Sequence, residues 1–341
     1  MKSLLRLLMA PLVWFLQACS PLGKPVDLAL SDNFYYNKSE TDIIYSSMGN
    51  WFELGKSPLN ADPESFIVLN DHLGKDKNQA YYREHAITDP ALDLESFRAS
   101  NEDWMWHIGM DDHRVYAFSH DVINGEWQLI TKIVETADPA TFQQYDLYWS
   151  KDAQRHFYNH EAISVDYATF EIINDTFAKD KGQIYLHYQG RFEAIAGDAE
   201  HFVKMDRYHA RDSSHVFFFL TYLRGEQQET LKQVLFQDAS TLRIVEESYL
   251  FADDAVYYRG TPLLQANAEQ MVILSETYAK DDQRVYYQDI EVEGADAATF
   301  DFDDKQFVYR DKRHRYRDGK VWHKDEGTEN ASSEMMDLSD E

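Results

Sequence analysis

The histidines are the residues of this sequence whose chemistry would most readily involve a metal ion. The chain has 13 histidines among 341 residues, and His156, His160 and Glu161 lie close together. Their spacing is not the His-Glu-x-x-His pattern of a zinc helix. On a β-strand, a spacing of four residues leaves two side chains about 13 Å apart, too far for one ion without other ligands. We therefore expect solvated histidines in strands or loops, and no cofactor.

Pairs of adjacent aspartates are candidate calcium ligands, because calcium prefers carboxylate and carbonyl oxygens. The pairs are Asp111-Asp112, Asp253-Asp254, Asp281-Asp282 and Asp303-Asp304. Three of them fall on a recurrent turn position, where an aspartate caps the backbone, and none matches the twelve-residue calcium loop. The sequence favours a structural role for these carboxylates, with calcium as the alternative.

The sequence contains no signature of a known catalytic site. It has no Gly-x-Ser-x-Gly run, no phosphate-binding glycine-rich loop and no cysteine in a nucleophile motif. Most carboxylates recur as turn formers, so no pair stands out as the acid and base of a glycoside hydrolase. We expect a protein that is not an enzyme, and keep cell-wall glycan binding or hydrolysis as the alternative.

Tryptophans outside the repeat pattern are candidate binding residues. Trp104 and Trp106 form a dense cluster with Met105, and Trp149 and Trp322 lie elsewhere in the chain. An exposed aromatic ring can stack on a sugar or anchor a protein partner. The competing interpretation is that these rings belong to the core between repeats.

A repeat that runs almost end to end must position all of these residues. Its first signature is an aspartate followed five residues later by an aromatic residue. Copies start at Asp76, Asp111, Asp152, Asp180, Asp212, Asp281 and Asp311, with a shorter copy at Asp253. Turn-forming residues beside the aspartate and apolar strands around it predict a β-hairpin. Because side chains alternate along a strand, we expect the aromatic residue to point into the core and its neighbours to be less buried.

The second signature is Asp-x-x-Ser/Thr-Phe, and its copies end at Phe66, Phe97, Phe142, Phe170 and Phe300. Aspartate followed by proline, as in Asp62-Pro63, suits the start of a helix. Each unit is therefore predicted to contain two or three short strands and one helical turn. The predicted fold is mainly β, a solenoid-like array of tandem repeats. A β-propeller is the alternative, although its blades of about 40 residues exceed the shortest repeat spacing.

These motifs resemble those of a known family. The run Asp76-Lys77-Asn78-Gln79-Ala80-Tyr81-Tyr82 and the run from Ala137 to Phe142 are similar to the DKNYY family of bacterial repeat proteins. The similarity extends over residues 32–323. It implies an envelope or secreted bacterial protein of uncharacterised activity, and it carries no catalytic residue that could be transferred.

The N-terminus has the features of a lipoprotein signal peptide. A short basic start precedes an apolar run from Leu4 to Leu16, which is shorter than a membrane span of about 20 residues. The run ends at Leu16-Gln17-Ala18-Cys19, which resembles a bacterial lipobox, and Cys19 is the only cysteine of the chain. We expect lipid modification of Cys19, with an uncleaved apolar anchor as the alternative.

This interpretation divides the chain into four parts. Residues 1–18 are the predicted signal peptide, residues 19–31 a tether, residues 32–324 the repeat domain, and residues 325–341 a disordered acidic tail. Ser20 follows the cysteine, and a residue other than aspartate at that position implies sorting to the outer membrane. The expected location is therefore the periplasmic face of that membrane, through a lipid anchor.

The charge balance restricts the partners of the protein. Lysine and arginine number 33 against 60 aspartates and glutamates, a formal net charge of −27. Such a chain repels nucleic-acid phosphates and anionic lipid headgroups, whereas a basic protein is a natural partner. We expect an envelope lipoprotein whose acidic β-repeat surface binds a protein partner. The sequence does not identify that partner or any small molecule.

The lipid anchor is testable by changing its single attachment point. Cys19→Ala should release the mature protein from the membrane fraction or leave the precursor unprocessed, because acyl chains supply the membrane affinity. Cell fractionation followed by immunoblotting measures both outcomes. A variant that is processed and membrane-bound like the parent would contradict the lipoprotein interpretation.

Overall fold

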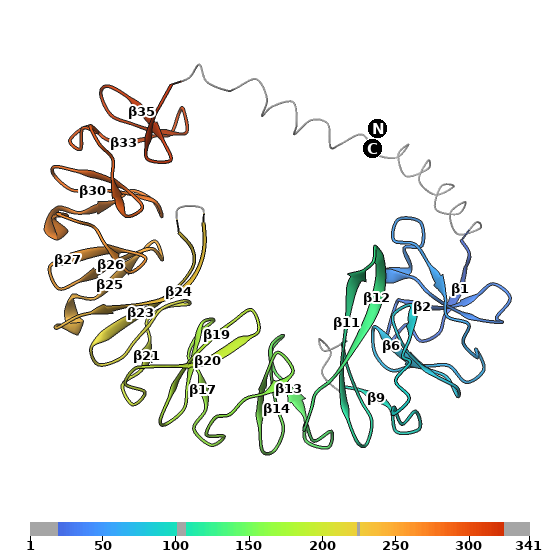
Figure 1. Cartoon of the computed structure of the whole chain (residues 1–341). Coiled ribbons are helices and arrows are strands. Elements are labelled where there is room, and N and C mark those ends of the chain that lie inside the picture. The colour runs from blue at the N-terminus through green and yellow to red at the C-terminus, as the bar shows by residue number, and fades with distance from the viewer. Residues whose placement is uncertain (1–19, 101–106, 224–225, 324–341) are drawn as a thin grey trace, which may run out of the picture. The chain divides into compact units, whose positions relative to one another are not determined.

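The protein is described here by a computed structural model, which covers residues 20–100, 107–223 and 226–323 (Figure 1). In these ranges, nine four-stranded antiparallel sheets follow one another along the chain. The predicted mainly β repeat array is therefore confirmed. The chain divides into two compact units, Met1–Tyr167 and Ala168–Glu341. No described helix is long and apolar enough to span a membrane.

The first unit holds four sheets. Their strands, in chain order with four to a sheet, are β1 (Leu22–Pro25), β2 (Phe34–Asn37), β3 (Ile43–Tyr45), β4 (Ser57–Pro58), β5 (Ile67–Val68), β6 (Leu73–Lys75), β7 (Ala80–Tyr82), β8 (His85–Ala86), β9 (Arg98–Ala99), β10 (Ile108–Met110), β11 (Val115–Ile123), β12 (Glu126–Ile133), β13 (Gln143–Gln144), β14 (Trp149–Lys151), β15 (His156–Tyr158) and β16 (Glu161–Ala162). A short 3₁₀ segment, η1 (Ser47–Gly49), follows β3.

The second unit holds the other five sheets. Their strands are β17 (Glu171–Ile172), β18 (Phe177–Lys179), β19 (Ile184–Tyr188), β20 (Arg191–Ile195), β21 (Val203–Lys204), β22 (Ala210–Arg211), β23 (His215–Leu223), β24 (Glu226–Leu235), β25 (Arg243–Val245), β26 (Tyr249–Ala252), β27 (Ala255–Tyr258), β28 (Thr261–Pro262), β29 (Val272–Ile273), β30 (Tyr278–Lys280), β31 (Val285–Tyr287), β32 (Ile290–Glu291), β33 (Asp301–Asp303), β34 (Val308–Arg310), β35 (Arg315–Arg317) and β36 (Lys320–Trp322). Two 3₁₀ turns, η2 (Ala239–Thr241) and η3 (Ala268–Gln270), precede β25 and β29.

Each sheet has four strands, where the sequence predicted two or three per unit. The difference arises because most of the strands are only two to five residues long, as β5 to β8 are. Such short strands let four of them fit into a unit of about 30 residues at 3.2–3.4 Å per residue.

A helical turn in every repeat is not confirmed. The second signature forms a 3₁₀ turn at η2 and η3. In the copy from Asp138 to Phe142 it closes as a simple turn, in which the Thr141 amide donates to the Asp138 carbonyl at 3.1 Å. The next strand starts directly after the signature, at Gln143, so too few residues remain to close the 13-atom rings of an α-helix.

The predicted tether contains part of the first sheet. Leu22–Pro25 forms β1, which pairs antiparallel with β2 with an irregularity in its register. The folded array thus begins about ten residues earlier than the boundary predicted at residue 32. The predicted signal peptide and acidic tail lie outside the described residues.

The inner strands bury side chains on both of their faces. On β7, Tyr81 packs into a cluster with Phe34 of the preceding sheet and Phe66 of its own repeat, whereas Tyr82 packs with residues of the next sheet, including Phe118. Adjacent residues of a strand point to opposite faces, so one sheet contributes to two cores. The same division recurs at β31, where Tyr286 joins one cluster and Val285 the next.

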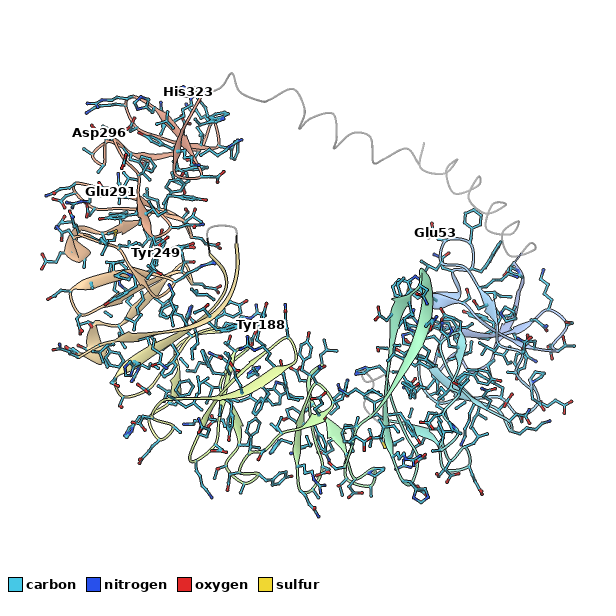
Figure 2. All side chains as sticks on the ribbon, in the orientation of Figure 1. Glu53, Tyr188, Tyr249, Glu291, Asp296 and His323 are labelled. Carbon is cyan, nitrogen blue, oxygen red and sulfur yellow. The ribbon has the colours of Figure 1, made fainter. Side chains whose placement is uncertain are left out.

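Within each compact unit, buried rings pack between consecutive sheets (Figure 2). Tyr249 is fully buried with Tyr258 and Tyr286 in one such layer. The phenylalanine of the second signature lies against a small residue: a Cβ added at Gly109 would come within 2.6 Å of the Phe97 ring. Small residues two positions before the aspartate of the first signature, such as Gly74 and Gly109, thus make room for the ring of the same repeat.

Removing an aromatic ring from either face of an inner strand should lower the stability of the protein. Tyr286 is fully buried and Tyr82 is only 4% exposed, so the expectation that Tyr82 is less buried is wrong. We predict that Tyr286→Ala and Tyr82→Ala each lower the free energy of unfolding by about 3–5 kcal/mol. Equilibrium denaturation measures the loss, with the exposed Leu147→Ala as a control that should change it by less than about 0.5 kcal/mol. A small loss for Tyr82→Ala would show that only one face of β7 carries the core.

Candidate functional site

The recurrent aspartates form a buried hydrogen-bond clamp. Asp111 is fully buried, and its Oδ1 accepts hydrogen bonds from the backbone N–H groups of His113 and Arg114, both at 2.7 Å. Its Oδ2 accepts the Tyr116 hydroxyl at 2.7 Å and the backbone N–H of Asp93 at 3.0 Å. One carboxylate therefore ties together the hairpin turn, the aromatic residue and the second signature of the same repeat.

The clamp recurs along the chain. Its buried aspartates are Asp76, Asp111, Asp152, Asp180, Asp212, Asp281 and Asp311. The tyrosine five residues later donates its hydroxyl to the clamp in four copies, at Tyr81, Tyr116, Tyr185 and Tyr316. In these four copies the hydroxyl bond adds to ring burial as a reason for the spacing of five residues, whereas Phe157 and Phe217 have no hydroxyl and Tyr286 donates to the Leu264 carbonyl.

A second bond returns from the clamp turn to the second signature. The hydroxyl oxygen of Thr141 accepts the backbone N–H of Ala153 at 3.1 Å, and that of Thr299 accepts the N–H of Lys312 at 3.1 Å. Each amide is that of the residue directly after the clamp aspartate. The Ser/Thr of the second signature is therefore a structural acceptor, a role that sequence reasoning missed although the residue type recurs.

These bonds leave the clamp aspartates poorly suited to bind calcium. Asp281 accepts the N–H groups of Gln283 at 2.8 Å and Arg284 at 2.6 Å on Oδ1, and that of Asn267 at 2.9 Å on Oδ2. The positive ends of these N–H dipoles point at the carboxylate and would oppose a cation. The predicted turn-forming role of Asp281 is confirmed. Asp296 likewise caps its own turn, accepting from the Thr299 amide at 3.2 Å.

The predicted tryptophan sites have different surroundings. Trp149 is 3% exposed and its ring packs 4.7 Å from that of Tyr158, so it is a core residue. Trp322 is partly exposed, and the Arg317 guanidinium lies over its ring at 4.8 Å. Trp104, Trp106 and Cys19 lie outside the described residues.

An exposed hairpin tip was missed by the sequence interpretation. Strands β11 and β12 are much longer than most, and Val122 and Trp127 are direct cross-strand partners near their ends. Trp127 is 67% exposed, Val122 50% and Ile123 36%. Asn124 and Gly125 link the strands with φ of 56° and 83°, as a tight two-residue hairpin turn requires. The available signal was the Asn-Gly pair, which is typical of a two-residue hairpin turn, with Ile123 before it and Trp127 two residues after it.

The histidines considered for zinc have separate neighbours. His156 is buried, with Nε2 3.3 Å from the Tyr167 carbonyl oxygen. The ring of His160 lies 5.9 Å from that of His107, and burial, together with the positive charges of His107 and Lys132, lowers the pKa of His160 to about 4. The spacing of His156 and His160 thus does not mark a metal site.

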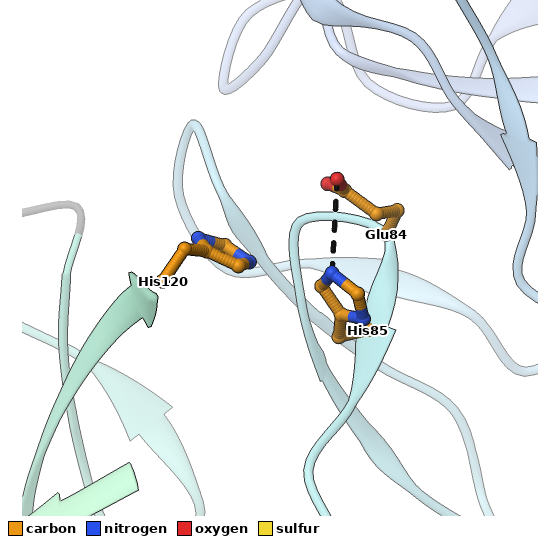
Figure 3. Close-up of side chains that lie close together, drawn as sticks. All are labelled: Glu84, His85 and His120. Carbon is orange, nitrogen blue, oxygen red and sulfur yellow. Dashed lines mark ion pairs between the residues drawn. The ribbon is translucent and has the colours of Figure 1, made fainter. Parts of the chain in front are cut away.

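Glu84, His85 and His120 form a cluster that the sequence did not reveal (Figure 3). Glu84 and His85 lie at the β7–β8 hairpin, whereas His120 lies on β11. Glu84 Oε1 is 3.7 Å from His85 Nε2, and the two imidazole rings are 5.0 Å apart. Because 35 residues separate His85 from His120, only packing of the second sheet on the third brings them together.

The clamp should make the protein sensitive to acid. Burial alone would raise the pKa of Asp311, but bonds from the amides of Asp296, His314 and Arg313 and from the Tyr316 hydroxyl lower it from 3.8 to about 2. Since the fold favours the carboxylate form, this stability is present above pH 4 and is lost as the pH falls toward 2. Asp311→Asn should cost about 2–3 kcal/mol at neutral pH and weaken the pH dependence between pH 4 and 2.

Urea denaturation at a series of pH values measures this effect. The exposed Asp304→Asn serves as the control and should leave the acid limb unchanged. The same measurements with and without calcium test the alternative role. A calcium-dependent increase in stability that is lost in Asp281→Ala would contradict the clamp interpretation and support a cation site.

The comparisons with known proteins place the chain in a family. The sequence profile of the DKNYY family matches residues 35–191 and 188–320. No curated protein and no solved structure matches the chain. The two matched segments contain the clamps and the stacked sheets described above, and together they cover most of the sequence. The chain belongs to the DKNYY family.

Proposed function

We propose that this protein is a non-catalytic lipoprotein of the bacterial envelope whose acidic β-repeat surface binds a protein partner. Cys19 attaches it to the membrane, and the outer membrane facing the periplasm is its proposed location. The proposal rests on the lipobox-like N-terminus, on the net charge of −27 and on the repeat architecture. Tandem repeats commonly present extended binding surfaces.

The exposed tip of the β11–β12 hairpin is the observation that carries the binding role. Val122, Ile123 and Trp127 lie outside the hydrophobic clusters of the repeats, although their exposure is unfavourable in water. A tryptophan on a rigid hairpin loses little conformational entropy on binding, and tryptophan is enriched among residues that dominate interfaces.

The charge around this tip indicates the chemistry of the partner. Asp121 lies at the tip and is exposed, and the chain carries almost twice as many acidic as basic residues. A partner that offers an apolar pocket with basic residues at its rim would complement both features. The clamp aspartates make no contribution to this surface because they are buried.

Cell-wall glycan binding or hydrolysis is the second candidate. An open depression of about 540 Å³ is lined by Phe302, Asp301 and Asp304, among others, and Phe302 is partly exposed. An aromatic ring beside carboxylates is a common arrangement for binding a sugar. Asp303, in the same depression, forms an ion pair with Arg310 at 3.0 Å, and its carboxylate is therefore already neutralised.

The binding role predicts a matched pair of variants. Trp127→Ala should weaken capture of an envelope protein by at least about tenfold, because loss of an interface hot spot costs 2 kcal/mol or more. The equally exposed Leu264→Ala, in the second unit, should retain the same protein. Captured material from envelope extracts is quantified for the parent and both variants at low and high salt.

Peptidoglycan sedimentation in parallel separates the two functions. Binding to peptidoglycan that is lost in Phe302→Ala but kept in Trp127→Ala would support the glycan alternative. Equal protein capture by the parent and Trp127→Ala would contradict the role of the hairpin tip.

A further inference from the structure

Three side chains of the kinds that bind metals meet between the second and third sheets of the first unit. One ligand atom from each of Glu84, His85 and His120 can be chosen so that all lie within 4.8 Å of one another. Among the described residues, this is the one such group of three or more histidines, cysteines and carboxylates. Figure 3 shows the His120 imidazole facing the hairpin that carries the other two residues.

Each of the three side chains has a buried polar atom without a hydrogen-bond partner. Nε2 of His85, Nε2 of His120 and Oε2 of Glu84 are all buried without one in the described part of the chain. Buried polar atoms nearly always have a partner, so three unsatisfied atoms in one place require an explanation. A single bound ion would satisfy all three.

The core holds the His120 ring in place. It stacks on Tyr82 with 5.4 Å between the ring centroids and 25° between their planes, and Tyr82 stacks in turn on Phe118. The imidazole therefore gives up little conformational freedom when it binds an ion. Burial lowers the pKa of His120 and so favours its neutral form, although the Glu84 charge acts in the opposite direction. A neutral imidazole is the form that coordinates a metal.

Arg83 is the cation that would oppose metal binding. Its Nε is 4.0 Å from Glu84 Oε2 and also donates to the Tyr45 hydroxyl at 3.3 Å. The Tyr45 hydroxyl is therefore a second partner of the guanidinium. It would keep Arg83 in place when the Glu84 carboxylate rotates toward a bound ion. Glu84 Oε1, on the other side of that carboxylate, already faces His85.

We propose that Glu84, His85 and His120 bind a divalent transition metal ion such as zinc. Two imidazole nitrogens and one carboxylate oxygen suit zinc and its neighbours, whereas calcium and magnesium prefer oxygen ligands alone. Ligand atoms of a tetrahedral zinc ion lie about 3.4 Å apart, so binding would draw the three groups closer together. Three protein ligands leave a fourth position open to water or to a partner.

The site would join two sheets at the base of the exposed hairpin. His120 lies two residues before Val122 on β11 and therefore on the same face of the hairpin. A bound ion would tie β11 to the β7–β8 turn and fix the direction of the hairpin. This inference is independent of the proposed partner binding, because it concerns residues of this chain alone.

Metal binding is testable with the full-length mature protein after treatment with a chelator. Addition of zinc should give one bound ion per chain by elemental analysis and should raise the melting temperature, since the ion binds the folded state. Cobalt in place of zinc should give the visible absorption of a four-coordinate site. His85→Gln and Glu84→Gln should each weaken zinc binding by more than the roughly 10–100-fold typical of losing an outer-shell partner.

The controls distinguish this site from other histidines. His113→Gln changes an exposed histidine and should bind zinc like the parent, and His160→Gln tests the neighbouring pair with His107. His85→Gln leaves the stacking of His120 on Tyr82 unchanged. Its melting temperature in chelator should equal that of the parent, so weaker zinc binding by this variant would not reflect unfolding. The proposal is overturned if zinc does not bind, if His85→Gln and Glu84→Gln both bind zinc like the parent, or if only His160→Gln loses zinc binding.

Discussion

The carboxylate of the clamp aspartate is the group on which most of the repeats depend. In the copy at Asp111 it accepts two amides of its own turn, one amide of the second signature and the hydroxyl of Tyr116. Hydrogen bonds to a charged acceptor are stronger than neutral ones, and a buried carboxylate without them would be strongly destabilising. The acidic composition of this chain is therefore in part a folding requirement, which recurs at seven buried aspartates.

Stacking of the sheets on one another also stabilises the fold. A two- or three-residue strand makes too few ladder hydrogen bonds to hold a sheet alone. Tyr81 and Tyr82 show how the chain compensates, because they send one ring to each side of β7. The sheet that contains β7 therefore depends on both of its neighbours, as expected of a repeat architecture in which stability depends on the interfaces between repeats.

The residues with a proposed function lie where the chain departs from the regular repeat. The β11–β12 hairpin is longer than the repeat requires and ends in exposed Val122 and Trp127. His120 lies on the same hairpin, in the part of β11 that extends beyond the length of a three-residue strand such as β7. Val122 and Trp127 take no part in the clamps or in the hydrophobic clusters of the repeats.

The sequence by itself determined the repeat, the positions of its turns and the family. Local hydrogen bonding explains this success, since an aspartate and the amides two and three residues later meet in any such turn. Pattern also identified the buried aromatic position, at Tyr286 for example. It gave the wrong burial for Tyr82, because periodicity along one strand does not reveal that a second sheet covers the opposite face.

Only the tertiary structure decided which distant side chains meet. It placed Trp149 in the core, left Trp127 exposed, and brought His120 to Glu84 and His85 across 35 residues of chain. The return bond from the clamp turn to Thr141 likewise joins residues 12 apart. A spacing in the sequence specifies contacts within a turn or strand, whereas contacts between sheets depend on how their faces stack, and no local pattern encodes that geometry.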